Sequence, residues 1–396
     1  MKITFFVYSI CGMGGTVRAT VNTANYLVTH GYTVEIISAK RTQHEPLFKI
    51  DQRVKLTWLL DARQDGSFLK KCFRKVVSYF PSRLIDNTED LYRHFNLFID
   101  ARLIYKLKRI SEGIVITTIP SFNMAQVKYA NKNVIKIGQE HKDFVVHHPS
   151  LQEKIKSAYG DLDIVMCLTE KEASRYRDFL SGEARVVSIE NTTQIPNIQT
   201  ELKSKMIISA GRFEYEKGYD LLIKAFEKIA YDFPDWTLKI FGRGSEEMKL
   251  KEMVKERNLD RQIFICSIEQ NIQKEMKRAS LYVLSSRNES FGLTIIEAMA
   301  VGLPVVSFAC IGPSEIIDHQ KDGLLVEERN IDKLAAAITY MISSPARLAE
   351  YSQHALAKVN QYSNDVVGTK WKMLLTELVE NSALSQETVG LEKSQN

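Results

Sequence analysis

The feature that most constrains the fold of this 396-residue chain is a repeated order of buried strand, glycine turn and amphipathic helix. The order first appears at the N-terminus, where an apolar strand over Ile3–Ser9 leads through a glycine turn into a helix over Val17–His30. A second strand over Thr33–Ser38 follows. A strand, a crossover helix and another strand form the unit of a parallel sheet. The sequence therefore predicts an α/β fold of parallel strands covered by helices.

The same order begins again in the second half of the chain, after an irregular polar stretch over Asn191–Lys203. A chain of this length fits two domains. We predict an N-terminal Rossmann-like domain over 1–195 and a C-terminal one over 196–380. The last helix, about 364–380, is expected to return to the first domain, and the polar residues 381–396 predict a frayed tail.

The strongest local motif is Ser285–Ala298, in which a strand ends, a loop carries Glu289 and a helix begins. The free N–H groups of Gly292 and Leu293 would bind an anion such as a diphosphate. Glu297 lies one to two turns into the helix and can accept two hydrogen bonds from a cis-diol such as a ribose, and Glu289 could reach sugar hydroxyls. Taken singly, a solvated loop glutamate and a helix-surface glutamate explain these two carboxylates better.

Two cations mark a second motif, Gly211–Gly218, again between a strand and a helix. Arg212 and Lys217 lie at a helix start, where the dipole favours anions and not cations. A bound polyanion would explain them, and an ordinary basic loop is the alternative. Because ligands of parallel sheets bind at the carboxyl ends of the strands, two facing domains would place the polyanion in the cleft between them.

A third motif is the glycine turn after the first strand. Gly12 and Gly14 begin a dinucleotide fingerprint, but Val17 stands where its third glycine belongs. Glu35 lies inside the second strand instead of at its end. NAD is therefore not expected, whereas the helix start at Gly15 remains suited to an acceptor or a phosphate.

Composition excludes several classes of protein. The net charge of +5 is too mild alone to argue for a nucleic-acid partner. The five cysteines are scattered and never form C-x-x-C, which argues against a disulfide framework or a zinc site and favours a reducing compartment. No apolar run approaches the ~18–20 residues of a membrane span. Asp161-Leu162-Asp163 is interpreted as a turn and not as a metal site.

Taken together and in order, these motifs resemble the retaining glycosyltransferases of the GT-B fold, glycosyltransferase family 4 (the group 1 glycosyltransferases). The resemblance covers residues 1–380 and is strongest over 206–326. It implies two facing Rossmann-like parallel-sheet domains with an interdomain cleft. It rests on Gly14-Gly15, Ile189-Glu190-Asn191, Arg212 with Lys217, Glu289 and Glu297, and Gly302-Leu303-Pro304-Val305-Val306.

The resemblance also implies a role for each motif. Arg212 and Lys217 would grip the donor diphosphate, Glu297 would hold the ribose, and Glu289 and His141 would lie near the transferred sugar. The implied catalytic residues are His141, Glu289, Arg212 and Lys217. The implied donor-binding residues are Gly15, Arg212, Lys217, Arg243, Ser290, Phe291, Gly292, Leu293 and Glu297. The family's glycine near the base pocket is matched here by Ser267, which leaves base selection open.

The implied reaction moves a hexose or N-acetylhexosamine from a nucleotide sugar to a glycan or polyprenyl-diphosphate-linked acceptor, in cell-surface polysaccharide biosynthesis. Front-face attack by the acceptor would retain the anomeric configuration, and the leaving phosphate would take its proton. No cofactor and no metal is expected. The segment Cys310–Ile316 resembles a loop of transferases that use UDP sugars, which favours UDP.

Basic and aromatic residues alternate at helical spacing over 68–80. Such a stretch can lie on an anionic membrane surface, and a helix that packs its aromatic rings inward is an equal alternative. We therefore expect a cytoplasmic protein with a peripheral site on the inner face of the cell membrane. Two other functions compete: a sugar-nucleotide epimerase of the same fold, and a non-catalytic sugar-nucleotide-binding protein.

Overall fold

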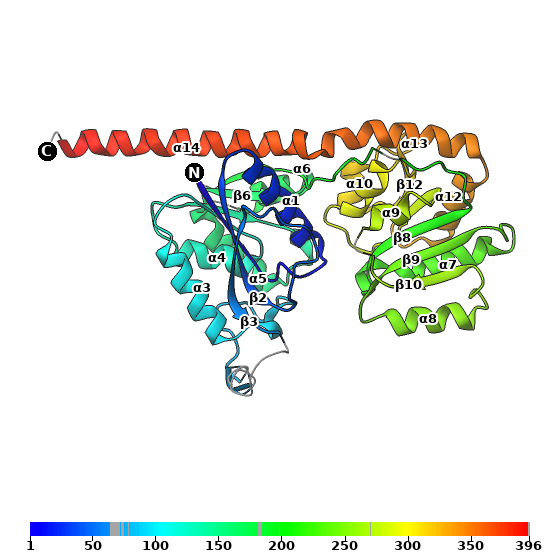
Figure 1. Cartoon of the computed structure of the whole chain (residues 1–396), viewed down its shortest axis with the longest axis horizontal. Helices are drawn as coiled ribbons and strands as arrows, with labels where there is room; N and C mark the ends of the chain where they lie inside the picture. Colours follow the sequence, from blue (N-terminus) through cyan, green and yellow to red (C-terminus); the bar gives the residue numbers. More distant parts are fainter. Residues whose placement is uncertain are drawn as a thin grey trace. The chain divides into compact units, whose positions relative to one another are not determined.

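A computed structural model describes residues 1–63, 72, 75–77, 79–180, 184–197, 199–269 and 271–394, with side chains up to Glu380. The chain forms two compact units, and the sequence places the boundary at residue 195, close to Glu190, where the chain passes into the second unit. The first unit comprises Met1–Cys167, Ala173–Ile189 and Asn364–Asn396, and the second comprises Leu168–Glu172 and Glu190–Ser363. Each unit is a parallel sheet covered by helices (Figure 1), as the sequence predicts.

The first unit contains a seven-stranded sheet of order β3-β2-β1-β4-β5-β6-β7, whose described pairs are all parallel. The strand order reverses between β1 and β4, which makes their carboxyl ends the topological switch point where such sheets bind ligands. The strands are β1 Lys2–Val7, β2 Thr33–Arg41, β3 Lys55–Asp61, β4 Ile114–Thr117, β5 Ile135–Gln139, β6 Ile164–Cys167 and β7 Arg185–Ser188.

Alternation along β1 divides the core of this unit between the two faces of its sheet. Ile3 and Phe5 pack with α1 and α14, whereas Phe6 packs with α3 and α4. Because successive side chains of a strand point to opposite faces, a strand that is buried at every position from Ile3 to Val7 must be covered on both sides. The helices are α1 Gly15–Thr29, α3 Leu97–Arg109, α4 Pro120–Tyr129, α5 Pro149–Ala158, α6 Glu170–Phe179 and α14 Asn364–Ser394.

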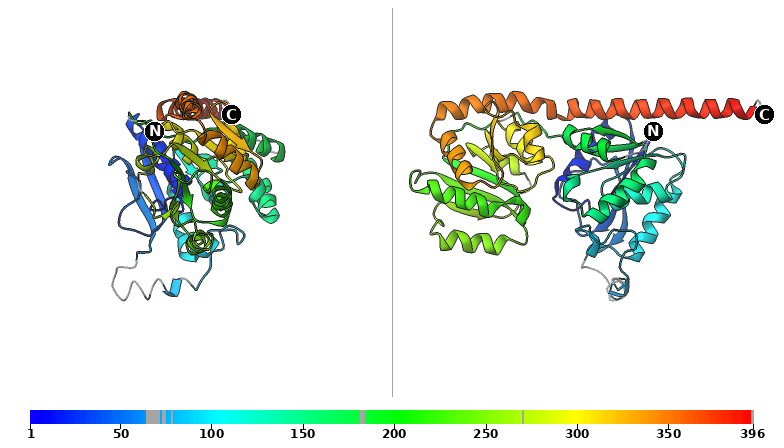
Figure 2. Two further views of the ribbon diagram at one scale, coloured as in Figure 1. Left: turned by 90° about the vertical axis from the view of Figure 1, so that its right-hand side faces the viewer. Right: turned by 180° about the vertical axis from the view of Figure 1, so that it is seen from behind.

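The last helix of the chain, α14, belongs to the first unit, as the fold prediction has it (Figures 1 and 2). Val367 and Trp371 are buried in the same core as β1 and α1. Gly368 lies against Tyr26 of α1 so closely that a Cβ there would be 2.3 Å from the ring. The helical backbone continues to Ser394, past the point where the sequence predicts a frayed tail.

The second unit contains a six-stranded sheet of order β10-β9-β8-β11-β12-β13, again parallel in its described pairs. The order reverses between β8 and β11. The strands are β8 Met206–Arg212, β9 Thr237–Arg243, β10 Ile263–Cys266, β11 Leu281–Leu284, β12 Val305–Phe308 and β13 Gly323–Val326. The helices are α7 Tyr219–Ala230, α8 Glu247–Glu256, α9 Ile272–Met276, α10 Leu293–Ala300, α11 Ile311–Ile316, α12 Ile331–Ile342 and α13 Pro345–Val359.

Two apolar clusters fill the faces of the second sheet. One combines β8 with α7, α8 and α12, and the other combines β8 with α9, α10 and α13. Neighbouring residues of β8 again divide between them, Ile207 on one face and Ile208 on the other. Both layers hold the carboxyl ends of β8 and β11 at one edge of the sheet.

Most of the predicted membrane-contacting stretch, 68–80, lies outside the described residues. In the part of the chain that is described, no helix is both long and apolar enough to span a bilayer. All five cysteines lie in that part and are free thiols.

Candidate functional site

The predicted cationic and acidic motifs of the second unit lie on the loops that follow β8 and β11, on either side of the strand-order reversal. Arg212 and Arg243 are the last residues of the adjacent strands β8 and β9 and are direct partners in the parallel register. Because paired residues of neighbouring strands project from the same face, these two guanidinium groups begin side by side. The structure therefore gathers three of the predicted donor-binding loops at one sheet edge.

The central contact of this site joins Lys217 to Glu289. The Lys217 Nζ lies 2.7 Å from the Glu289 Oε2, which also accepts a hydrogen bond of 3.3 Å from the Ser286 Oγ. Both side chains of the ion pair are less than one-fifth exposed. The two residues are 72 positions apart in the chain. A cation and a carboxylate implied to act on one ligand are thus in direct contact, with one side still open to solvent.

Arg212 is more exposed and forms an ion pair with Glu216, four residues further along. Arg243 is also exposed, and no ion pair of its side chain occurs among the described residues. Two exposed guanidinium groups on neighbouring strand ends repel one another unless an anion lies between them. Their arrangement fits a polyanionic ligand at this edge.

Arg287 holds the two site loops together. Its guanidinium donates to both carboxylate oxygens of Asp220, at 2.8 and 2.7 Å, and to the Tyr215 carbonyl at 2.6 Å. It also lies over the Tyr215 ring, 3.9 Å from the centroid. Burial opposes ionisation of Asp220, but the hydrogen bonds and charge of Arg287 outweigh it and lower its pKa. The sequence analysis gave Arg287 no role, because its partners lie 67 and 72 residues away.

Gly218 allows the two loops to touch. Its φ of +64° is left-handed, and a Cβ at this position would be 2.0 Å from the Ser285 carbonyl oxygen. The Ser285 Oγ in turn donates to the Lys217 carbonyl at 3.2 Å. A side chain at residue 218 would therefore push Lys217 away from the loop that carries Glu289.

Helix α10 begins after Gly292, whose φ is +97°. The next two N–H groups, of Leu293 and Thr294, start the helix and carry its positive dipole end. Ser290 lies just before this start, whereas the Phe291 ring is buried in the core, so that only its backbone could meet a donor. Glu297 is 2% exposed, which excludes the alternative of a solvated helix-surface glutamate.

The first unit contributes the other two predicted residues. Gly15 begins α1, and a Cβ there would meet no atom within 4 Å. His141 follows the carboxyl end of β5, and its Nε2 atom is buried without a hydrogen bond from the described residues. Burial lowers the pKa of His141 to about 4, against the opposing charge of Glu140, so the imidazole is neutral near pH 7.

A buried polar network surrounds Glu140, the neighbour of His141, and the sequence analysis missed it. The Glu140 carboxylate accepts hydrogen bonds from the Tyr159 hydroxyl and from the Asn123 Nδ2, the latter at 2.8 Å, and lies 3.6 Å from the His147 Nε2. Glu140 is 3% exposed. These contacts fix the backbone that carries His141, because a buried carboxylate must keep its partners.

Nothing in the described part of the chain gathers three or more His, Cys, Asp or Glu side chains around a candidate metal site. Asp161 ends a short 3-10 turn before β6, and the Asp163 carboxylate accepts the Lys136 N–H at 2.7 Å, as the turn interpretation predicts. Ser267 follows β10 and is exposed.

Fold and site together define a class of protein: two parallel-sheet α/β units, of which the second presents cations, a buried glutamate and a helix start at its switch point. Comparison with known proteins agrees. Residues 190–358 match the family Glycosyl transferases group 1. They cover nearly the whole second unit, including all the second-unit site residues named above.

Two relatives and one solved structure extend the likeness to the whole chain. An exopolysaccharide phosphotransferase of Streptomyces coelicolor is 30% identical over 96% of this chain, which spans 41% of that protein's length. An uncharacterised glycosyltransferase of Haemophilus influenzae is 26% identical over 94% of this chain and 99% of its own. The structure of a TarM variant of S. aureus has a TM-score of 0.77 and 18% identity, over 94% and 99% of the two chains. Residues 190–358, less than half of the chain, thus match the group 1 glycosyltransferases, and the chain as a whole has the GT-B fold of the compared structure.

Proposed function

We propose that this chain is a retaining glycosyltransferase of family 4 that moves a hexose or N-acetylhexosamine from a UDP sugar to a glycan or lipid-linked acceptor in surface-polysaccharide biosynthesis. The similarity to an exopolysaccharide enzyme supports the pathway. The TarM variant was solved with UDP and alpha-GlcNAc-glycerol, which supports the donor and the sugar class. The single observation that carries the proposal is the contact of Lys217 with Glu289 beside Arg212 at the switch point of the second sheet.

The chemistry follows from the charges at this site. When the bond between the sugar C1 and the phosphate oxygen breaks, negative charge grows on the diphosphate and positive charge on the sugar ring. Arg212, Lys217 and the start of α10 would stabilise the departing diphosphate. Glu297 would accept hydrogen bonds from the ribose hydroxyls, and Glu289 would accept hydrogen bonds from hydroxyls of the transferred sugar.

The acceptor oxygen then forms its bond to C1 on the face that the phosphate leaves, which retains the configuration. The acceptor hydroxyl gives its proton to the departing phosphate, so that no protein base is needed. The neutral His141 imidazole would contribute a hydrogen bond to the sugar without adding positive charge. No cofactor and no metal enters this step.

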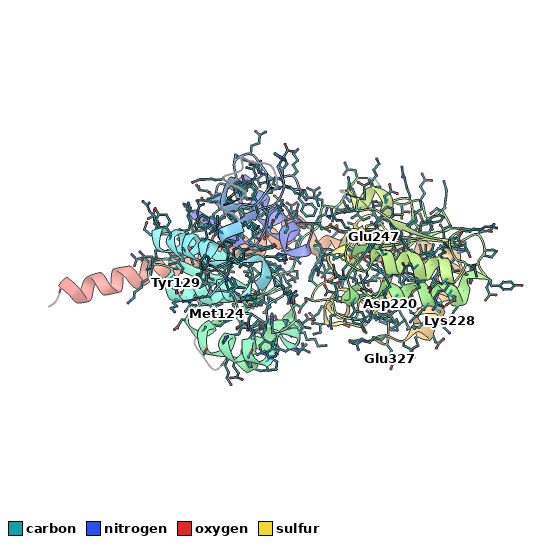
Figure 3. All side chains as sticks on the ribbon, turned by 90° about the horizontal axis from the view of Figure 1, so that it is seen from below. Met124, Tyr129, Asp220, Lys228, Glu247 and Glu327 are labelled. Carbon is teal, nitrogen blue, oxygen red and sulfur yellow. The ribbon has the colours of Figure 1, made fainter. Side chains whose placement is uncertain are left out.

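The test is the variant Lys217→Ala. Removing one cation from the diphosphate should lower the transfer rate by roughly 10²–10³-fold, a loss typical of one stabilising group. The rate is measured as UDP release with acceptor present, and circular dichroism checks that the fold is retained. Lys228→Ala is the matched control, since this lysine pairs with Asp332 elsewhere in the second unit (Figure 3). Wild-type transfer by Lys217→Ala would refute the proposed site.

The same assay separates the two competing functions. An epimerase would convert the sugar of the donor without an acceptor, and a binding protein would retain the donor unchanged. We propose a cytoplasmic location, supported by the five free thiols, which suit a reducing compartment. Peripheral membrane contact through 68–80 remains a proposal, tested by liposome binding of Lys75→Glu against the wild-type chain.

A further inference from the structure

A pocket of about 460 Å³ lies in the first unit, and none of the site residues assigned above lines it. Its walls are the segment 82–87 with Tyr92, residues of α4, and Lys154 of α5. Met124 and Tyr129, both labelled in Figure 3, belong to the α4 wall. A volume of this size falls in the range of small-molecule sites.

The wall formed by segment 82–87 is held in place by buried hydrogen bonds. The Ser82 Oγ and the Arg83 N–H donate to the two oxygens of the buried Asp100, at 2.7 and 2.8 Å. The Asp86 N–H donates to the Ser121 Oγ on α4 at 2.8 Å. Because these groups have little exposure to solvent, the pocket is formed before any ligand arrives.

The charges that line the pocket leave an excess of cations. The Asp86 carboxylate is buried and neutralised by the Lys154 Nζ at 2.6 Å, and it also accepts from Thr88. Arg83 and Lys128 are exposed, and neither has an acidic partner among the described residues. Two cations without an acidic partner, one of them Lys128 with its Nζ 5.4 Å from the centroid of the Tyr129 ring, therefore line a pocket in which Asp86, the one carboxylate among the described lining residues, is already paired.

The remaining lining suits a hydroxylated chain. Tyr92 and Tyr129 are half-buried, and both line the pocket with a ring and a hydroxyl group each. Asn87 adds an amide at the rim, where it is exposed. One amide and several hydroxyl groups beside aromatic carbon fit the hydroxyl groups of a ligand better than they fit a purely apolar ligand.

We propose that this pocket binds a phosphate-bearing segment of the acceptor, a chain of sugar or polyol phosphates. The statement that this ligand is the acceptor rests on the proposed function. Binding of a phosphate-bearing chain to the pocket does not depend on it. Arg83 and Lys128 would each meet a phosphate, and the two tyrosines would contact the hydroxylated part between them.

Binding is measured without any nucleotide sugar, by calorimetric titration of the full chain with short poly(glycerol phosphate). We expect binding that weakens as salt rises, because the contacts are ionic. Arg83→Glu with Lys128→Glu should weaken it at least tenfold. Lys49→Glu is the control, because it reverses one charge on an exposed loop that does not line the pocket. This variant should bind poly(glycerol phosphate) with the affinity of the wild type.

A second titration uses a neutral glucan of similar length in place of the poly(glycerol phosphate). We expect the protein to bind this glucan weakly or not at all. Equal binding of the neutral and the phosphorylated chain would overturn the proposal, as would unchanged affinity in the double variant. Lys128→Gln removes one charge without reversing it and should give a smaller loss, which keeps the test valid if the double variant folds poorly. Absence of UDP-sugar turnover in the wild type would refute the proposed function and leave the binding result standing.

Discussion

At the scale of single residues, the site of the second unit depends on side chains that the sequence could identify and on others that it could not. Arg212, Lys217, Glu289 and Glu297 stand in motifs that predict an anion site. Arg287 stands in the same stretch as Glu289, but nothing local distinguishes it from a solvated arginine. Its role follows only from the fold, which brings Asp220 within 2.8 Å of it.

Arg287→Lys tests this positioning role. An ammonium cannot replace the two-pronged contact with Asp220 and also reach the Tyr215 carbonyl. We expect the KM for the nucleotide sugar to rise several-fold, with a loss of stability on the order of 1–3 kcal/mol. Steady-state kinetics and thermal unfolding measure the two effects.

Arg257→Lys is the matched control, since Arg257 pairs with Glu227 outside the site. A KM that is unchanged in Arg287→Lys would show that the loops keep their places without the guanidinium.

The carboxyl group of Glu89, which interacts with the charge of Glu140, gives a prediction on the pH dependence of stability. Burial raises the pKa of Glu89 to about 7, the hydrogen bonds from Ser121 oppose this, and the charge of Glu140 adds to it. The folded chain thus holds a proton that the unfolded chain releases above about 4.5. Stability should therefore fall as pH rises from about 4.5 to 7 and change no further above that range.

Glu89→Gln should remove this part of the pH dependence, on the order of 1–3 kcal/mol between pH 5 and 8. Urea unfolding at both pH values measures it. Asp90→Asn, at the exposed neighbouring position, serves as the control. Identical pH dependence in Glu89→Gln and the wild type would rule out this assignment.

At the scale of elements, the sequence predicted best those segments that glycine and proline delimit. The helix predicted over Val17–His30 corresponds to α1, Gly15–Thr29, between the glycine turn and Gly31, and the strand predicted from Thr33 begins there as β2. The sequence analysis did not identify β3, α3, α4 or α5. In α4 the reason is physical: Ser121, Asn123 and Gln126 are fully buried beside Phe122 and Ala125, so its buried residues do not form a continuous apolar stripe.

Gly218→Ala tests the contact between the two site loops. The added Cβ would meet the Ser285 carbonyl at 2.0 Å, so the loop must move and Lys217 with it. We expect transfer to fall by roughly a hundredfold, the loss that a displacement of about 1 Å can cause. The transfer rate and the melting temperature are both measured.

Gly31→Ala separates the clash from the cost of the backbone conformation. Gly31 also has a positive φ, +87°, but nothing lies within 4 Å of its Cβ position. This variant should lose about 1 kcal/mol of stability and keep its transfer rate. Equal activity of the two variants would contradict the steric explanation.

At the scale of the whole molecule, the strands of the two sheets follow one another along the chain, whereas the helix α14, which comes after both sheets, belongs to the first unit. The second unit lies within residues 168–363, whereas the first is closed by α14. Apolar side chains of α14 contribute to the first unit's core, among them Trp371 and Leu375. The sequence predicted this helix and its return, whereas the contacts that hold it, such as Gly368 against Tyr26, appear only in the fold.

Truncation after Ser363 should therefore unfold or strongly destabilise the first unit. Each buried side chain that is lost removes about 1.5–3 kcal/mol, and four of them lie in this core: Val367, Trp371, Leu374 and Leu375. Hydrogen exchange of the β1 and β4 amides measures the effect. Truncation after Glu380 retains all four and should leave exchange at the wild-type level, and equal protection in both truncations would contradict the prediction.

The position of α14 has a consequence for synthesis on the ribosome. Chains with several domains commonly complete the N-terminal one first, as soon as it emerges. Here α14, which follows the whole second unit in the chain, supplies part of the first sheet's cover, so the strands of that sheet must wait until the residues of the second unit have been translated. The later sheet has its full sequence available earlier, and a ribosome that stops short of α14 releases a protein whose C-terminal half is finished and whose N-terminal half is not.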